Sequence, residues 1–379
     1  MATPLREIVG AYHPQVPLKE ASTPPSSWYT DGRIYDLEIS EIFSCSWQFI
    51  GCSEQVQKPG QFLTSQVSGE PILVVRGIDG ALRGFFNVCR HHAAVVMTEP
   101  EGKADNLRCP YHGWTYDLTG ALIHTPEFAG VANFDRSANG LVPVNIAEWQ
   151  GWVFAQLAAG VPVLEDFLGN DLIERFERLD LDRRRWFERR HYTLNCNWKV
   201  FVDNYLDGGY HVPHIHGGLN SVLDYTNYRV ETGGRFCLQS SPIATDKGDA
   251  KTAAVRTGSR ALYYWIYPNF MINIYDGLMD TNLVIPRAVD RTEVIFDYYF
   301  ADVSEQARER NRASITVSEQ IQNEDVAICA SVQRGLASRA YETGRLSVRR
   351  EAGEHLFHRL LHADLQAGIK SDNDDTLRR

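Results

Sequence analysis

The sequence predicts an α+β protein in which a small all-β unit precedes a larger antiparallel sheet flanked by helices. Between about residues 49 and 154, short alternating segments are broken by Gly, Pro and Asn, which is typical of short strands with tight turns. After residue 184, longer segments rich in aromatic and β-branched residues predict the strands of the larger sheet. Apolar residues at helical spacing in 163–179 and 304–338 predict two helical regions.

Composition and charge narrow the class of protein. The 379 residues suffice for two domains, and 44% hydrophobic with 23% charged residues is ordinary for a globular chain. A net charge of −10 without a Lys/Arg-rich block argues against nucleic-acid binding. The longest apolar run, 151–164, is too short to cross a bilayer, and the N-terminus shows no secretory signal. We expect a cytoplasmic protein, or a protein of an organelle stroma if a transit peptide has been removed.

Two cysteine–histidine pairs form the first constellation of candidate ligands. Cys89 and His91 stand as Cys-x-His, and seventeen residues later Cys109 and His112 stand as Cys-x-x-His. Zinc is the ordinary alternative for two cysteines and two histidines, but zinc sites usually keep like ligands together. One thiolate and one imidazole on each loop favour a Rieske [2Fe–2S] cluster, with both cysteines on one iron and both histidines on the other. His92 lies outside this pattern.

The second constellation lies in the segment 203–216, which reads "DNYLDGGYHVPHIH". We expect the helix that begins near residue 197 to continue through His211. Asp203, Asp207 and His211 are spaced four apart, so they would share one helix face. A buried Asp–His hydrogen-bonded pair is the structural alternative to a metal site. The two glycines, costly inside a helix, favour a functional role.

A second histidine ligand is expected after the bend at Pro213. Proline ends or kinks the helix near residue 212, and this bend allows His216 to turn back towards His211. His214 could also reach, and the spacing alone leaves the choice open.

A carboxylate from a distant helix is expected to complete the site. In the segment 315–336, Asp325 falls within roughly 20° of the middle of an apolar helical stripe, whereas Glu324 is about 80° away. The members of that stripe are Ile321, Ile328, Val332 and Leu336. An aspartate facing a core needs a cation or strong donors; an N-cap or an ion pair with an arginine is the alternative. Two imidazoles and one carboxylate form the facial triad of non-haem Fe(II) oxygenases.

Together these motifs resemble the catalytic α subunit of Rieske non-haem iron oxygenases over almost the whole chain. The segment "CPYHGW" resembles Rieske proteins. The resemblance is strongest to plant-type choline monooxygenases, through "NWKVFVDNYLDGGYHVPHIH", "IYPNFMINIY", "MDTNLVIP" and "NEDVAICASVQRGL". It implies a Rieske domain (45–160) inserted into a catalytic domain (1–44 and 161–379) with a helix-flanked antiparallel sheet. It also implies that His211, His216 and Asp325, but not His214, bind the mononuclear iron.

The resemblance further implies a head-to-tail homotrimer, or a dimer of trimers, in which the cluster of one subunit supplies the iron of its neighbour. Electrons come from NAD(P)H through a flavin reductase, a ferredoxin or both, because the chain has no GxGxxG dinucleotide loop. The family usually has a bridging acid three residues before the first iron histidine, where this chain has Gly208. Asp207 is the expected substitute, and Asp203, one turn earlier, is the alternative.

The implied reaction is O₂-dependent hydroxylation of choline to betaine aldehyde hydrate, a step of glycine betaine biosynthesis, or of a similar N-methylated amine. Aromatic faces bind quaternary ammonium ions. The candidate pocket residues are Tyr205, Tyr210, Tyr263, Trp265, Tyr267, Phe270 and Tyr275. Residues 276–278 depart from the plant pattern, which has an aromatic residue nearby. Open alternatives are N-demethylation or ring hydroxylation on the same architecture, a purely electron-transferring Rieske protein, and a zinc module.

Overall fold

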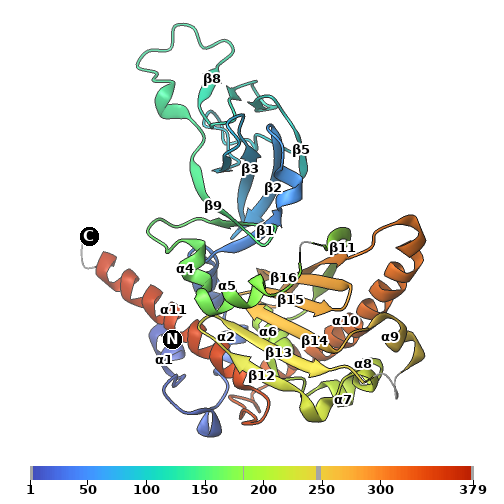
Figure 1. Ribbon diagram of the computed structural model, residues 1–379. Helices are drawn as coiled ribbons and strands as arrows, with labels where there is room; N and C mark the ends of the chain where they lie inside the picture. The colour runs from blue at the N-terminus through green and yellow to red at the C-terminus, as the bar shows by residue number, and fades with distance from the viewer. Residues whose placement is uncertain (1–2, 182, 245–248, 377–379) are drawn as a thin grey trace. The chain divides into compact units, whose positions relative to one another are not determined.

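The chain forms two compact units. The computed structural model describes residues 3–181, 183–244 and 249–376, with side chains as far as residue 370. One unit is Phe43–Leu164, and the other combines Met1–Ile42 with Glu165–Arg379. Figure 1 follows both along the chain. The smaller unit is therefore an insertion in the larger one, which confirms the expected fold class.

The smaller unit is built from antiparallel strands. One sheet has the order β1-β10-β9-β4-β3-β2-β5, and a second has the order β6-β7-β8. The strands are β1 (Gln48–Cys52), β2 (Gln61–Val67), β3 (Glu70–Arg76), β4 (Leu82–Phe86), β5 (Glu101–Lys103), β6 (Leu107–Arg108), β7 (Thr115–Tyr116), β8 (Leu122–His124), β9 (Pro143–Trp149) and β10 (Trp152–Gln156). A buried cluster that includes Phe85, Trp114 and Tyr116 also contains Cys89 and Cys109. The core of this unit thus packs directly around the two cysteines.

The larger unit is organised around one antiparallel sheet with the order β11-β17-β16-β15-β14-β13-β12. Its strands are β11 (Arg185–Leu194), β12 (Arg229–Thr232), β13 (Phe236–Pro242), β14 (Arg260–Ile266), β15 (Phe270–Tyr275), β16 (Leu278–Ala288) and β17 (Arg291–Phe300). Tyr264 of β14 packs on Phe176, with ring centroids 4.8 Å apart. Its neighbour Trp265 packs on Phe357, at 5.4 Å. Successive side chains of a strand point to opposite faces, so both faces of this sheet are covered.

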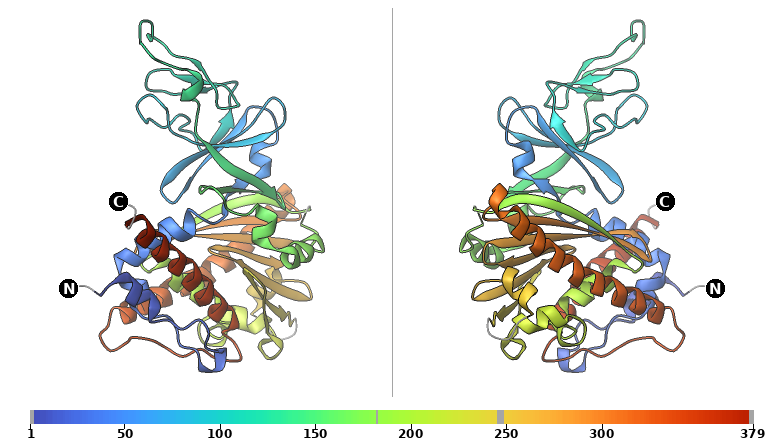
Figure 2. Two further views of the ribbon diagram at one scale, coloured as in Figure 1. Left: turned by 90° about the vertical axis from the view of Figure 1, so that its left-hand side faces the viewer. Right: turned by 90° about the vertical axis from the view of Figure 1, so that its right-hand side faces the viewer.

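Helices cover the sheet of the larger unit. They are α1 (Leu5–Gly10), α2 (Ser27–Thr30), α3 (Gly32–Glu38), α4 (Leu164–Leu168), α5 (Asn170–Glu177), α6 (Trp198–Leu206), α7 (Val212–Ile215), α8 (Gly217–Val222), α9 (Ala250–Val255), α10 (Arg308–Leu336) and α11 (Ala352–Thr376). Helix α6 contacts β16, α10 and α11, and Figure 2 shows the two long helices α10 and α11 against the sheet. Within the described residues, every helix is too short or too polar to cross a membrane.

A buried ion pair ties the N-terminal segment to the larger unit. Lys199 Nζ of α6 lies 2.5 Å from Glu38 Oε1 of α3, and both side chains are fully buried. Trp198 Nε1 donates to the other oxygen of Glu38 at 2.7 Å. Burial raises the pKa of Glu38 and lowers the pKa of Lys199, so each charge depends on its partner. This contact explains why residues before the insertion fold with the unit that follows it.

Candidate active site

The two predicted cysteine–histidine pairs come together on two loops of the smaller unit. Cys89 and His91 lie after β4, and Cys109 and His112 lie between β6 and β7. The two thiols are hydrogen-bonding neighbours, and the backbone N–H groups of Tyr111 and His112 face the sulfur of Cys109. The rings of His91 and His112 are 4.7 Å apart. Thiols therefore gather on the buried side of the site and imidazoles on its outer side.

The surroundings of this site fit a metal cluster. Nδ1 of His91 is buried and forms no hydrogen bond with any described residue, although its ring is fixed by parallel stacking on Trp114 at 4.7 Å. Tyr116 Oη lies 3.4 Å from Cys89 Sγ and accepts the backbone N–H of Arg90 at 2.9 Å. An unsatisfied nitrogen beside two buried thiols is costly without a ligand, and a [2Fe–2S] cluster would use all of these donors.

The helix before the second constellation ends earlier than the sequence predicts. Helix α6 ends at Leu206, and Gly208 and Gly209 both have φ of +69°. A Cβ on Gly208 would lie 2.1 Å from the backbone oxygen of Arg350. The expectation of one helix face through Asp203, Asp207 and His211 is therefore wrong: only a glycine permits this left-handed turn against the backbone.

Three predicted ligand atoms nevertheless face one another across two elements. His211 Nε2 and His216 Nε2 are 3.1 Å apart, and His216 Nε2 lies 3.1 Å from Asp325 Oδ1. His211 Nε2 lies 3.8 Å from the same oxygen. The short helix α7 between the two histidines has Pro213 in its first turn, where proline costs no hydrogen bond. His214 is exposed on the outer side of this turn.

Two carboxylates and one amide form hydrogen bonds with these three side chains. Asp207 accepts from the backbone N–H of His211 and lies 2.6 Å from its Nδ1. Glu324 Oε2 lies 2.6 Å from Nδ1 of His216, and Asn204 donates to Asp325 Oδ1 at 2.8 Å. Such partners fix the orientation and tautomer of metal-binding histidines. Both Nε2 atoms are left directed at Asp325, an arrangement that fits a divalent iron with open positions.

The buried face of α10 is more polar than the predicted stripe. Asp325 lies on that face, but Val332, a proposed member of the stripe, is 43% exposed. The polar residues that the face buries are Asn311, Ser314, Ser318, Gln322 and Asp325. The stripe was placed by apolar residues alone, whereas this face is turned towards a polar cavity. The helical phase of Asp325 was still correct.

Asp203, the alternative bridging acid, lies in a different cluster. Its carboxylate accepts from Tyr29 Oη at 2.7 Å and lies 2.9 Å from His358 Nε2. Tyr29 belongs to α2 and His358 to α11. These contacts draw Asp203 away from the ligand atoms, whereas Asp207 contacts a ligand histidine directly.

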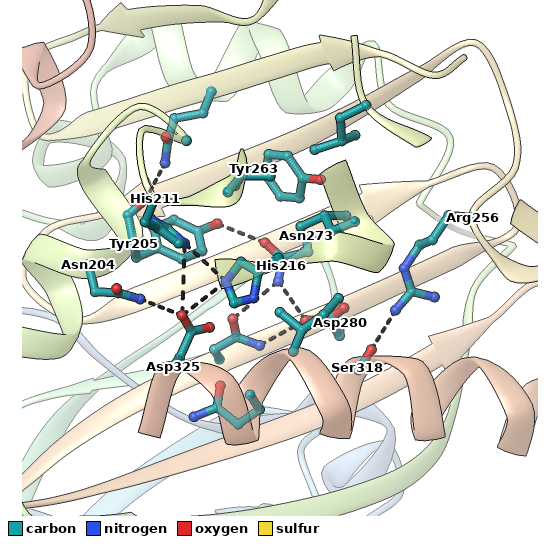
Figure 3. Close-up of a pocket in the computed structure, with 18 of the residues that line it drawn as sticks. Asn204, Tyr205, His211, His216, Arg256, Tyr263, Asn273, Asp280, Ser318 and Asp325 are labelled. Atoms are coloured by element: carbon teal, nitrogen blue, oxygen red, sulfur yellow. Dashed lines mark hydrogen bonds and ion pairs between the residues drawn. The ribbon is translucent and has the colours of Figure 1, made fainter. Parts of the chain in front are cut away.

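A pocket opens beside the three ligand atoms, which form one end of it in Figure 3. It opens to solvent, and its cavity volume is about 120 Å³. Tyr205, Tyr263 and Tyr275 line it as expected, and Tyr228 is a lining residue that the sequence analysis missed. The Oη atoms of Tyr263 and Tyr275 are 2.7 Å apart.

Other aromatic candidates do not line the pocket. Tyr210 is 48% exposed. Trp265 shares a strand face with Tyr263, but it lies farther along β14, where Phe357 of α11 covers the sheet. Tyr267 donates to Asp364 of α11 at 2.6 Å, and Phe270 is buried.

The sequence analysis also missed three polar residues that line the pocket: Arg256, Asp280 and Gln322. A signal for Asp280 existed in the sequence, because Asp280 and Asn282 alternate within an otherwise apolar strand. Arg256 and Gln322 had no comparable local signal.

Comparisons with known proteins decide the family. Residues 46–135 match the profile of the Rieske [2Fe–2S] domain, and residues 181–367 match that of the ring hydroxylating alpha subunit (catalytic domain). The chloroplastic choline monooxygenase of Arabidopsis thaliana is 38% identical over 377 residues, which cover 96% of this chain and 87% of that protein. The chain belongs to the Rieske non-haem iron oxygenases.

Other relatives of this oxygenase have related activities. The oxygenase subunit of carnitine monooxygenase from Escherichia coli K12 is 32% identical, with 85% of this chain and 86% of that protein covered. The structure of a quaternary ammonium Rieske monooxygenase superposes with a TM-score of 0.82 at 27% identity, covering 97% and 99% of the two chains. Naphthalene 1,2-dioxygenase from Rhodococcus shares the fold, with a TM-score of 0.74 at 20% identity over 91% and 94%.

Membership of the family establishes the class of enzyme and its cofactors. The chain is an O₂-dependent monooxygenase with a Rieske [2Fe–2S] cluster and a mononuclear iron. Its electrons come from NAD(P)H by way of a partner reductase. The two clusters of donor atoms described above are the sites whose chemistry fits these groups.

Proposed function

We propose that Cys89, His91, Cys109 and His112 hold the [2Fe–2S] cluster and that His211, His216 and Asp325 hold the mononuclear iron. When bound, this iron supplies O₂ activation. The residues of the chain then position the reaction: Asp207 and Glu324 keep both Nδ1 atoms occupied, at 2.6 Å each. The two Nε2 atoms are thereby kept available for the metal.

Asp207 is also the proposed bridge for electrons that arrive from the cluster of a neighbouring subunit. Its carboxylate contacts Nδ1 of His211 at 2.6 Å, and it is 14% exposed, so a residue of a partner can reach it. Asp203, held by Tyr29 and His358, lacks such a contact with a ligand. The proposed assembly is a homotrimer or a dimer of trimers that receives electrons from a reductase, directly or through a ferredoxin. A location in the cytoplasm or an organelle stroma stays a prediction.

The proposed substrate is a quaternary or N-methylated ammonium compound, with choline as the reference. The observation that carries this proposal is the group of tyrosines around the pocket. Tyr228 and Tyr263 are stacked with centroids 6.4 Å apart, and Tyr275 stands nearly perpendicular to Tyr263 at 5.9 Å. Several aromatic faces around one space bind a desolvated cation by cation–π attraction. The known activities of the choline and carnitine monooxygenases support the same class.

In the proposed reaction, one oxygen atom of O₂ enters a C–H bond beside the ammonium nitrogen or its substituent, and the other leaves as water. Two electrons and two protons balance the step. Hydroxylation of the carbinol carbon of choline gives betaine aldehyde hydrate, whereas hydroxylation of an N-methyl group gives formaldehyde and the demethylated amine. The pocket positions the substrate, and the tyrosine faces favour a cation over a neutral molecule of the same shape.

The test is turnover of the purified oxygenase with a reductase and ferredoxin, read by O₂ consumption and by mass spectrometry of the products. Choline should yield betaine aldehyde with about one O₂ per product. The matched control is 3,3-dimethylbutan-1-ol, which replaces the ammonium nitrogen by carbon and should bind at least about tenfold more weakly than choline. Formaldehyde from N-methylated amines would instead identify an N-demethylase, and turnover confined to neutral arenes would refute the proposal.

A further inference from the structure

Among the residues that the structure describes, no anionic side chain pairs with Arg256, an arginine in the pocket wall. Arg256 follows α9, is only 3% exposed and lines the pocket. Its guanidinium donates to Ser314 Oγ at 2.7 Å, to Ser318 Oγ at 2.6 Å and to the backbone oxygen of Ser314 at 3.5 Å. All three acceptors are neutral, and no described residue forms a hydrogen bond with the buried Nε. The guanidinium also lies over the ring of Tyr275, 5.0 Å from its centroid.

The same pocket contains a buried carboxylate. Asp280 of β16 is 3% exposed, and its Oδ1 accepts from the side-chain amides of Asn273 and Asn282, both at 2.8 Å. Among the described residues, no hydrogen bond reaches Oδ2. Burial raises the pKa of Asp280, while the two amides and the positive charge of Arg256 lower it. The asparagines thus hold the carboxylate in place and leave one oxygen for another partner.

The two opposite charges are not joined to each other. In the described part of the chain, no ion pair within 4.0 Å links Arg256 to Asp280, and the two groups affect each other only at a distance. In Figure 3, Asp280 lies between the ligand histidines and Arg256, and Arg256 lies at the far side of the pocket. A buried charge without a close partner is costly, so this separation calls for a ligand that supplies both countercharges.

A further hydrogen-bond donor lies on α10, the helix whose serines accept hydrogen bonds from Arg256. Gln322 of α10 is 3% exposed and lines the pocket. Its Nε2 is buried, and no described residue forms a hydrogen bond with it. It follows Ser318 by four residues and precedes Asp325 by three, so all three share one helix face. One face of α10 therefore presents Asp325 as a metal ligand, Gln322 as an amide donor and Ser318 as an acceptor for the guanidinium of Arg256.

We propose that the substrate is a zwitterion, an N-methylated ammonium compound that also carries a carboxylate. Asp280, Tyr228 and Tyr263 receive the ammonium group, and Arg256 receives the carboxylate with help from Gln322. This inference rests on the proposed function and narrows it, because choline supplies the cation but not the anion. A guanidinium–carboxylate contact is among the stronger recognition contacts in proteins.

The alternative is that Arg256 and Asp280 only balance each other at a distance. In that case their replacement would reduce stability without changing the choice of substrate. The proposal instead predicts a change of selectivity in a correctly folded enzyme, so the experiment compares ligands that differ only in the anion.

The test uses γ-butyrobetaine, its methyl ester and choline with the holoenzyme. Dissociation constants are measured by calorimetry without reductant, and kcat/KM is measured with the reductase system. The wild type should prefer the acid over its ester by at least about tenfold in both quantities, because the ester keeps the ammonium but loses the charge. Arg256→Gln should abolish that preference by weakening the acid alone, and Arg256→Lys should restore part of it. Asp280→Asn should weaken acid and ester alike.

Lys251→Gln is the matched control, since it removes an exposed cation of α9 and should leave the preference unchanged. Equal binding of acid and ester by the wild type would overturn the inference even if Arg256→Gln fails to fold. A preference that survives in folded Arg256→Gln would also overturn it. If choline is oxidised at least as well as the acid, the proposed function stands and this inference fails. If no ammonium compound is bound or oxidised, the proposed function itself fails.

Discussion

Replacing Gly208 by alanine should destabilise the catalytic unit and empty the mononuclear iron site. Gly208 has φ of +69°, where an L-residue costs about 1–2 kcal/mol. The added Cβ would also lie 2.1 Å from the backbone oxygen and 2.9 Å from Cα of Arg350. Backbone atoms cannot move aside by changing rotamer, so overpacking adds about 1–3 kcal/mol. The expected total is about 2–5 kcal/mol.

Gly277 offers a matched control in the same unit. It also has φ of +69°, but a Cβ there would meet no atom within 4 Å. Gly277→Ala should therefore cost only the conformational term, about 1–2 kcal/mol. Urea unfolding followed by tryptophan fluorescence measures both variants, and metal analysis measures iron per chain. Because Gly208 sits between Asp207 and His211, only Gly208→Ala should also lose the mononuclear iron. Equal midpoints and equal iron contents in the two variants would refute this reasoning.

Three further changes test individual contacts. Glu324→Gln should speed loss of the mononuclear iron to a chelator by about 10–100-fold, because it weakens the hydrogen bond that orients His216. Glu309→Gln, an exposed change on the same helix, should leave the rate unchanged. Glu38→Gln should lower the free energy of unfolding by about 3–5 kcal/mol, because it leaves Lys199 buried without its partner; a loss below about 1 kcal/mol in a urea titration would contradict a buried ion pair. Tyr116→Phe should lower the reduction potential of the Rieske cluster, because it removes a hydrogen-bonding group 3.4 Å from a cysteine sulfur, and redox titration that gives an unchanged potential would refute this role.

The sequence was informative wherever ligands are close together or follow helical phase. Cys89 and Cys109 each stand within three residues of a histidine, so local spacing alone indicated the cluster. Asp325 lies more than a hundred residues after His211, yet its place on the buried face of α10 followed from a repeat of 3.6 residues per turn. In both cases spacing within a short stretch of the chain, two loops for the cluster and one helix for Asp325, carried the prediction.

The errors arose where tertiary contacts decide the local structure. The end of α6 depends on the approach of Arg350 to Gly208, which lies 142 residues away along the chain. Asp203 is drawn towards Tyr29 and His358, from opposite ends of the sequence. Neither contact leaves a periodic signal near residue 208.

The polar residues that line the pocket likewise depend on tertiary contacts that the sequence does not show. Asp280 pairs in register with Asn273 across β15 and β16, and its alternation with Asn282 could have been recognised in the sequence. Arg256, by contrast, lies in an irregular segment between α9 and β14, and only the folded chain brings it to Ser314 and Ser318 of α10.

Iron analysis of the purified enzyme tests the central claim most directly, namely that His211, His216 and Asp325 hold a catalytic iron separate from the Rieske cluster. The wild type should contain about three irons per chain, two in the cluster and one at the triad. His216→Ala should contain about two, keep the Rieske EPR signal and form no product. A wild type with only two irons, or a His216→Ala enzyme that keeps its third iron or its activity, would contradict this assignment.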